Sequence, residues 1–582
     1  MKGVLAHWRY RTDASERSRT STLPLRDRVL AARGIRGADA VSAHLEPKLT
    51  HLHDPSGIPD LDRAAERVLA ACRANEPIVI YGDYDVDGVT GTAILWHMLK
   101  AIAPDARVRT YVPHRLNEGY GLNTEAIREL AAEGARLVVT VDCGITGHGP
   151  ARAAADLGVE MIITDHHNPP DRMNGLPEAV AVVHPRRPDS AYPFRDLSGA
   201  GVAYKLAWRL ATMHCGGDRA SPGLRGLLVD LLAFASLGTI ADVVPLLGEN
   251  RVIARHGLVR CKHSRFVGLR ALVAASGLAG EDIDSMAVGF RLGPRLNAAG
   301  RMGHAREANE LFTTDDPTRA SEIAEHLSKQ NSARQDVERR ILEQAEELAL
   351  NNGMTGSLGR RAIVLAHPDW HAGVVGIVCS RLVERHHRPV ILMNLRDGVA
   401  HGSGRSIEGF NLHEAIASCG EHTAKFGGHD MAAGLQVVEP KLRSFTRAFL
   451  DYADRTIDPD RLSRRLTVDC DALLGELDAE TVASMELMQP YGAGNPDPTL
   501  RLTGVVVTDR PMPLGSSGKH LAVLTRDPAC DRRVRMVGWN MGEHRERFRT
   551  GAKFDLVVRP RISRWQGAAR VEAEILDFCD TA

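Results

Sequence analysis

The stretch "PIVIYGDYDVDGVTG" (residues 77–91) decides the fold of the first half of this chain. It opens with an apolar run of strand length, and a helix-like segment, "TGTAILWHMLKAI", follows. A continuously apolar strand is typical of a parallel sheet that helices cover on both faces. Between strand and helix stand three aspartates at alternate positions, Asp83, Asp85 and Asp87. Like charges so close together repel unless something neutralises them.

Further apolar runs of strand length lie on both sides of helix-like segments. Three follow the first one, "RLVVTV" (136–141), "VEMIIT" (159–164) and "AVAVVHP" (179–185). Two more, "RAIVLA" (361–366) and "RPVILM" (388–393), flank a helical stretch later in the chain. Alternating strands and helices indicate an α/β protein with two parallel-sheet lobes.

The length of 582 residues favours two to four domains. A long connecting helix is expected between the lobes, capped by Asp316 and ended by Gly353. After about residue 465, short strands separated by turns predict a C-terminal β-barrel. We therefore expect five parts: an N-terminal helical and polar segment packed on the core (1–75), a first lobe (76–260), a helical region with the connecting helix (261–353), a second lobe (354–455) and the barrel (465–579).

Acids and histidines follow the predicted parallel strands at the point where each strand ends. Asp142 follows the second strand, and the triplet Asp165, His166 and His167 follows the third. Asp242 ends an apolar helix-like stretch. Because sites in open α/β sheets form at the carboxyl ends of the strands, we expect these side chains to meet at one edge.

Cations are the expected remedy for so many carboxylates in one place. Carboxylate oxygens with imidazole nitrogen suit Mn²⁺ or Mg²⁺, and a pair of such ions is common machinery for attack on phosphoesters. The alternative of a calcium loop of the EF-hand type fails because that pattern requires a glutamate after Gly88, and position 94 is Ile.

The composition of the chain bears on its ligand, its cellular compartment and its association with membranes. The formal net charge is zero, which neither favours nor excludes nucleic acid as a ligand. Nine scattered cysteines indicate reduced thiols, so we expect a cytoplasmic protein. The apolar runs look too short to cross a bilayer, and no membrane association is expected.

The order of several motifs resembles a known family. "GDYDVDG", "VDCG", the Asp165–His167 triplet and "IADVVPL" resemble the DHH phosphoesterase superfamily. "LSGAGVAYKL", "RLGPRLNAAGRMG", "HPDWHAGVVGIVCSRL", "HGSGRSIEGFNL", "KFGGHDMAAG" and "QPYGAGNPDP", in this order, resemble the RecJ family of single-strand-specific DNA exonucleases. The resemblance implies a DHH lobe, a DHHA1 lobe and a C-terminal OB-fold. It also implies 5′→3′ degradation of single-stranded DNA to 5′-mononucleotides.

The resemblance also implies roles for the residues at the strand ends. Two Mn²⁺ or Mg²⁺ ions would be held by six residues: Asp83, Asp85, Asp87, Asp142, His166 and Asp242. Asp142 would bridge the ions, and Asp83 would be a ligand or a neighbour. His167 would face the scissile phosphate, and Asp165 would orient a histidine. His184 stands where the family often has Asn, outside the metal set.

Recognition of a 5′ end requires a phosphate pocket, for which "HGSGRS" is the candidate. Gly402 and Gly404 would let backbone N–H groups approach a phosphate, while Ser403 and Arg405 would add a hydroxyl and a guanidinium. The resemblance adds Arg115 to this pocket. It also suggests strand-contacting loops with Arg295, Arg301 and His429 as DNA contacts.

Other functions fit parts of the pattern. One is a DHH phosphodiesterase for short oligonucleotides or cyclic dinucleotides, although such relatives are shorter. Another is a non-catalytic DNA-binding scaffold, which the complete set of acids disfavours. Single-strand binding by the barrel alone would explain only the last hundred or so residues.

As an exonuclease in DNA recombination and repair, the protein would take single-stranded DNA with a 5′ end as substrate. Family members work beside single-strand-binding protein and a helicase.

Overall fold

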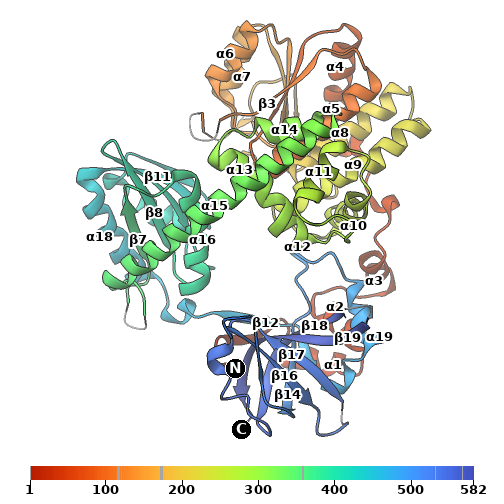
Figure 1. The fold of residues 1–582 in the computed structure, drawn as a ribbon. Helices are drawn as coiled ribbons and strands as arrows, with labels where there is room; N and C mark the ends of the chain where they lie inside the picture. Colours follow the sequence, from red (N-terminus) through yellow and green to blue (C-terminus); the bar gives the residue numbers. More distant parts are fainter. Residues whose placement is uncertain are drawn as a thin grey trace. The chain divides into compact units, whose positions relative to one another are not determined.

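The protein is described by a computed structural model that covers residues 2–114, 118–119, 121–170, 175–356, 359–530, 532–565 and 568–581. By its internal contacts the chain divides into two compact units, whose helices and strands are labelled in Figure 1. One contains Glu46–Gln335 together with Pro490–Pro496, and the other contains Met1–Leu45, Asp336–Gln489 and Asp497–Ala582.

The unit of Glu46–Gln335 is built on a five-stranded sheet in the order β3-β2-β4-β5-β6, and all its strand pairs are parallel. Its strands are β2 (Ile78–Gly82), β3 (Val108–Tyr111), β4 (Leu137–Val141), β5 (Glu160–Thr164) and β6 (Ala181–Val183). The predicted parallel sheet is therefore confirmed. Strands β2 and β4 are buried throughout because both faces of the sheet are covered, as their apolar sequence requires.

Two hydrophobic cores lie on opposite faces of this sheet, because successive side chains of β2 point to opposite faces. Val79 and Tyr81 pack with α6 (Thr124–Ala132) and α7 (His148–Asp156) on one face. Ile78 and Ile80 face the larger core on the other side. That core includes α4 (Leu61–Arg73), α5 (Val86–Ile102), α8 (Gly199–His214), α9 (Pro222–Ala241), α10 (Gly248–Lys262) and α11 (Val267–Ala275).

Helix α9 corrects one expectation from the sequence. It is long and apolar enough to cross a membrane by length and composition, although the apolar runs had looked too short. Inside the protein, 67% of its most apolar window is buried, and it packs against α5, α8 and α10. These contacts are those of a core helix.

Short helices follow, and then the long one. They are α12 (Ser285–Ala287), a π-helical turn (Val288–Leu292), α13 (Gly293–Met302) and α14 (Arg306–Thr313). Helix α15 (Pro317–Asn351) runs without a break, so the predicted connecting helix is confirmed. Asp316 Oδ1 accepts a hydrogen bond from Thr318 N, and Gly353 beyond its end has a φ of 64°. Both ends follow the sequence signals.

The second lobe differs from the expectation in its sheet. Its order is β10-β11-β9-β8-β7, and of these pairs β7–β8 is parallel while the other three are antiparallel. The second sheet is therefore mixed, because hairpins rather than crossover helices join β8 to β9 and β10 to β11. The elements are β7 (Ile363–His367), α16 (Ala372–His386), β8 (Val390–Arg396), β9 (Val399–Arg405), α17 (Leu412–Ala417), β10 (Lys425–Gly428), β11 (Ala432–Val438) and α18 (Glu439–Thr456).

The C-terminal strands close into a barrel, as predicted. Strand β14 pairs with β18 and also with β16, which closes the ring β14-β18-β19-β17-β16. The elements are β13 (Cys470–Ala472), α19 (Ala479–Glu486), β14 (Leu500–Val507), β15 (Met512–Leu514), β16 (His520–Arg526), β17 (Arg533–Gly538), β18 (Lys553–Trp565) and β19 (Ala568–Asp580).

The N-terminal segment is divided between the two units rather than packed as one piece. Residues after Leu45, including α4, belong to the unit of the first sheet. Strand β1 (His7–Tyr10) instead pairs in parallel with β12 (Arg465–Val468). The buried carboxylate of Asp577 accepts hydrogen bonds from Leu5 N, Ala6 N and Trp8 Nε1. Helices α1 (Ala14–Thr20), α2 (Leu25–Ala32) and α3 (Ala38–Leu45) follow in the same unit.

Candidate active site

Three carboxylates of the site lie in the tight turn between β2 and α5. Asp83 follows β2, and Asp85 is the N-cap of α5, where its Oδ1 accepts hydrogen bonds from Asp87 N (2.9 Å) and Gly88 N (3.1 Å). Both capping hydrogen bonds go to Oδ1, so the N-cap occupies only one of the two carboxylate oxygens of Asp85. A Cβ on Gly88 would lie 2.5 Å from the carbonyl oxygen of Asp83, so the turn requires glycine there.

Asp142 follows β4 with a left-handed backbone, φ 64°, and its side chain is buried. A non-glycine residue in this conformation is strained, and such strain is often found at functional sites. Gly199 at the start of α8 makes room for it, because a Cβ on Gly199 would lie 2.5 Å from the Cβ of Asp142.

The triplet after β5 is organised by Asp165. Its Oδ1 accepts hydrogen bonds from His166 N and His167 N and lies 2.8 Å from His167 Nδ1, while Oδ2 accepts one from Ile145 N. Burial alone would raise the pKa of Asp165, but the hydrogen bond and charge of His167 lower it to about 2. Asp165 therefore orients His167, and the other ring nitrogen of His167 points away from this pair.

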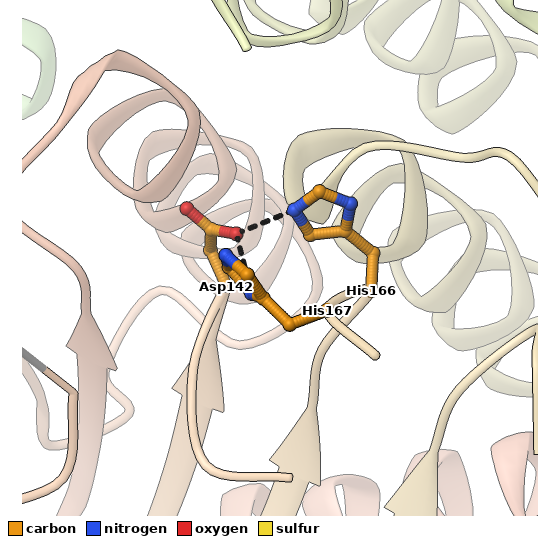
Figure 2. Close-up of side chains that lie close together, drawn as sticks. All are labelled: Asp142, His166 and His167. Carbon is orange, nitrogen blue, oxygen red and sulfur yellow. Dashed lines mark ion pairs between the residues drawn. The ribbon is translucent and has the colours of Figure 1, made fainter. Parts of the chain in front are cut away.

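The separate ends converge on His166 and Asp142 (Figure 2). His166 Nε2 lies 3.1 Å from Asp142 Oδ1 and 3.4 Å from Asp242 Oδ2. Within the described residues, three overlapping groups have candidate ligand atoms within 4.8 Å of one another. They are Asp83–Asp85–Asp142, Asp87–His166–Asp242 and Asp142–His166–His167.

The electrostatics of this cluster favour a bound cation. Burial and the surrounding aspartates raise the pKa of Asp142 well above its usual range. Burial, followed by the nearest carboxylates, raises the pKa of Asp87 to about 7 and that of Asp242 to about 8. Burial and the charge of His167 lower the pKa of His166 to about 3. His166 is therefore neutral, which is the form that binds metals.

Polar atoms at the centre of the cluster lack hydrogen bonds. Within the described chain, Asp142 Oδ1 and both ring nitrogens of His166 are buried without a hydrogen-bond partner. Leaving such groups unpaired is costly. A divalent cation would satisfy the oxygen and one nitrogen together, and the donor set of carboxylates and imidazole suits Mn²⁺ or Mg²⁺.

Sequence reasoning missed the amides that hold Asp87. At the N-terminus of α8, Gly199 N donates to Asp87 Oδ2 (2.6 Å) and Ala200 N donates to Asp87 Oδ1 (2.9 Å). The positive end of a helix stabilises a carboxylate in this position. The signal was present, since Ser198 in "LSGAG" is the N-cap of α8.

His184, which was expected outside the metal set, contacts the backbone of the triplet. Its Nε2 lies 2.7 Å from the carbonyl oxygen of His167, and its Nδ1 accepts a hydrogen bond from Arg186 N. These two contacts fix the proton on Nε2, so that His184 supports the backbone of His167.

The "HGSGRS" stretch is not a loop. It lies in β9, hydrogen-bonded between β8 and β11, so the sheet occupies the backbone that was expected to meet a phosphate. Gly402 and Gly404 instead allow close packing: a Cβ would lie 2.6 Å from Leu435 at the first and 2.9 Å from Leu412 at the second. The proposed backbone role of both glycines is therefore wrong.

Ser403 and Arg405 stay together on the opposite face of β9. Arg405 Nη1 donates to Ser403 Oγ (3.1 Å) and to the carbonyl oxygen of Gly404 (2.7 Å). Both side chains are half-buried, which leaves part of each accessible. Arg115, the third expected member of this pocket, lies outside the described residues.

The other expected DNA contacts have different settings. The segment of Arg295 and Arg301 is helix α13, not a loop. Arg295 is half-buried, donates to Ser328 Oγ and to the carbonyl oxygen of Arg291, and burial lowers its pKa. Arg301 is half-buried, whereas His429 is exposed in the turn between β10 and β11.

Three family patterns match the chain in succession. They are the DHH family, N-terminal domain, at residues 77–235, the DHHA1 domain at 359–455 and the RecJ OB domain at 468–577. The single-stranded-DNA-specific exonuclease RecJ of Bacillus subtilis (strain 168) is 36% identical over 95% of this chain and 68% of its own length. The chain belongs to the RecJ family. Its RecJ-type OB domain coincides with the closed barrel.

Other RecJ proteins agree with this assignment. RecJ of Dickeya dadantii (strain 3937) is 36% identical, over 85% of this chain and 86% of its own length. The crystal structure of RecJ in complex with Mn²⁺ from Thermus thermophilus matches with a TM-score of 0.80 at 31% identity, covering 99% of this chain and 80% of that one. The family resemblance predicted from the motifs is thus confirmed.

Proposed function

We propose that this protein is a metal-dependent exonuclease that degrades single-stranded DNA from the 5′ end and releases 5′-mononucleotides. One observation carries the proposal: three overlapping groups of acids and histidines meet at the carboxyl ends of β2, β4 and β5 and the end of α9. Membership of the RecJ family supports the choice of single-stranded DNA as substrate.

Two of the three groups support our choice of ligands for the ions. Asp83 and Asp85 with Asp142 would hold one Mn²⁺ or Mg²⁺ ion, and Asp87, His166 and Asp242 would hold a second, with Asp142 between them. RecJ structures containing Mn²⁺ and Mg²⁺ support this choice of ion. When bound, the ions supply Lewis acidity toward a phosphoester and a nucleophile at neutral pH.

The protein's own groups position the phosphate. The Asp165–His167 hydrogen bond raises the pKa of His167 to about 9, against the effect of burial. His167 is therefore cationic and can donate a charge-assisted hydrogen bond to a phosphoryl oxygen. The amides at the start of α8 hold Asp87 in place.

The 5′ end would be recognised by side chains of the second lobe. Arg405 and Ser403 offer a guanidinium and a hydroxyl on one face of β9, and we assign them to the terminal phosphate. Arg295, Arg301 and His429 would contact the strand further along.

We place the enzyme in the cytoplasm in DNA recombination and repair, beside a helicase that exposes single strands and single-strand-binding protein that covers them.

The test uses a long single strand labelled at its 5′ or its 3′ end, incubated with Mn²⁺ or with EDTA. Early release of a labelled mononucleotide from the 5′ end alone, abolished by EDTA, is expected. Release from the 3′ end would overturn the polarity and the pocket on β9. Binding without cleavage would indicate a scaffold, and cleavage of dinucleotides alone would indicate a small-substrate phosphodiesterase.

A further inference from the structure

The face of β9 that carries Ser403 and Arg405 lies against helix α16, and a glycine stands at the point of contact. A Cβ on Gly376 would lie 2.9 Å from Ser403 Oγ and 3.4 Å from Arg405 Nη2. One helical turn further, the Sγ of the buried Cys379 donates to the carbonyl oxygen of Ser403 at 3.0 Å. Helix α16 therefore contacts both the side chain and the backbone of Ser403.

Glycine is not what the helix itself prefers at this position. Gly376 lies inside α16 and its φ is not in the left-handed region, so alanine would favour the helix. Nor is the backbone of β9 what excludes a methyl group. The atoms that a methyl group would meet first are the ends of the Ser403 and Arg405 side chains.

We infer that Gly376 is a positioning residue for 5′-phosphate recognition, since it lets Ser403 and Arg405 adopt their shared geometry over α16. This inference rests on the proposed role of that pair. A methyl group at position 376 would push Ser403 Oγ away, and Arg405 Nη1 would lose one of the two oxygens to which it donates, keeping only the carbonyl oxygen of Gly404. Both side chains can rotate, so the change would alter recognition rather than folding.

The experiment measures dissociation constants of strands with a 5′-phosphate and a 5′-hydroxyl in EDTA, where no cleavage occurs. For Gly376→Ala, the preference for the phosphate is expected to fall about tenfold, because a charge-assisted contact is weakened. The melting temperature should stay the same or rise. The matched control is Gly226→Ala in α9, where a Cβ meets nothing within 4 Å, and its preference should equal that of the wild type.

A double mutant separates positioning from damage to the fold. If Gly376 acts through the pair, Gly376→Ala should cause no further loss in an Arg405→Ala background. A further loss there, or full preference in Gly376→Ala while Arg405→Ala loses it, would overturn the inference. A wild type without preference would overturn the phosphate pocket and this inference, whereas 5′-end release of mononucleotides would still test the exonuclease separately.

Discussion

His166 Nε2 lies 3.1 Å from Asp142 Oδ1, and yet neither atom has a hydrogen-bond partner within the described residues. Two groups from neighbouring parallel strands thus meet with their coordinating atoms turned toward the same point (Figure 2). Such an arrangement is unfavourable for the protein alone and favourable with a cation between the side chains. This pair and its neighbours should therefore couple metal binding to both stability and hydrolysis.

Replacing Asp142 should separate activity from stability. Asp142→Asn removes a carboxyl group whose charged form is disfavoured by burial and the neighbouring aspartates, so the metal-free protein should melt at a higher temperature than the wild type. Hydrolysis of single-stranded DNA should fall by at least about 100-fold, because the residue shared between the two groups is lost. Thermal unfolding in EDTA and rates in Mn²⁺ measure the two effects. Wild-type activity in this variant would contradict the metal centre.

Metal should stabilise the folded protein by linkage. At a free Mn²⁺ concentration 100 times the dissociation constant, one site contributes about 2.7 kcal/mol to the free energy of unfolding. The melting temperature should therefore rise with Mn²⁺ and fall back with EDTA. In His166→Ala most of this rise should be absent. The neighbouring His184→Ala, which lacks a place among the ligands, should retain it.

Removing the carboxylate that orients His167 should affect turnover more than metal binding. In Asp165→Asn, the charged partner of His167 Nδ1 is lost, so the imidazole loses part of its positive charge and its fixed orientation. The value of kcat should fall about 10- to 100-fold. The Mn²⁺-dependent shift in melting temperature should remain near that of the wild type. Loss of that shift would mean that Asp165 is itself needed to hold the ion.

Arg405→Ala should weaken the preference for a 5′-phosphate. Loss of a charge-assisted hydrogen bond is worth about 1.5–3 kcal/mol, or roughly 10- to 100-fold in relative affinity. Competition between phosphorylated and unphosphorylated strands measures this preference. Arg396→Ala, an exposed arginine at the end of β8, serves as a control and should leave the preference unchanged.

Asp577 should be important for stability although it lies far from the catalytic lobe in sequence. Asp577→Ala removes the acceptor of three donors of the N-terminal segment, two of them in buried bonds, which costs about 3 kcal/mol or more. The unfolding transition of the unit that contains Asp577 should shift to lower urea concentration. Asp580→Ala, an exposed residue of the same strand, should change it little. Equal effects of the two substitutions would contradict a structural role for Asp577.

The fold and the candidate ligands of the catalytic lobe could be predicted from the sequence. Both depend on the apolar pattern of the strands and on which residues follow each strand. Continuously apolar strands fix a parallel sheet, and a parallel sheet brings the residues that follow each strand to one edge. That reasoning was enough to select Asp83, Asp142 and His166 from the sequence alone. The contribution of the amides of Gly199 and Ala200 depends on where α8 packs, which no local pattern gives.

The second lobe was predicted less well for a physical reason. Glycine-rich sequence such as "HGSGRS" suits a phosphate-binding loop and equally a strand whose glycines admit neighbouring side chains. Only the pairing of β9 with β8 and β11 distinguishes these cases. The N-terminal segment posed a similar problem, because its partner strand lies more than 450 residues away in the sequence, at Arg465–Val468.

The hydrogen bond from Leu5 N to Asp577 Oδ1 joins residues 572 positions apart, so it can form only after Asp577 has been synthesised. At a ribosomal rate of roughly 5–20 residues per second, about half a minute to two minutes separate the synthesis of the two. Until Asp577 has been made, Leu5 N, Ala6 N and Trp8 Nε1 lack this acceptor, although β12, the partner strand of β1, is made earlier. The contact around Asp577 therefore forms late, and the barrel can be completed only after translation of its last strand, β19.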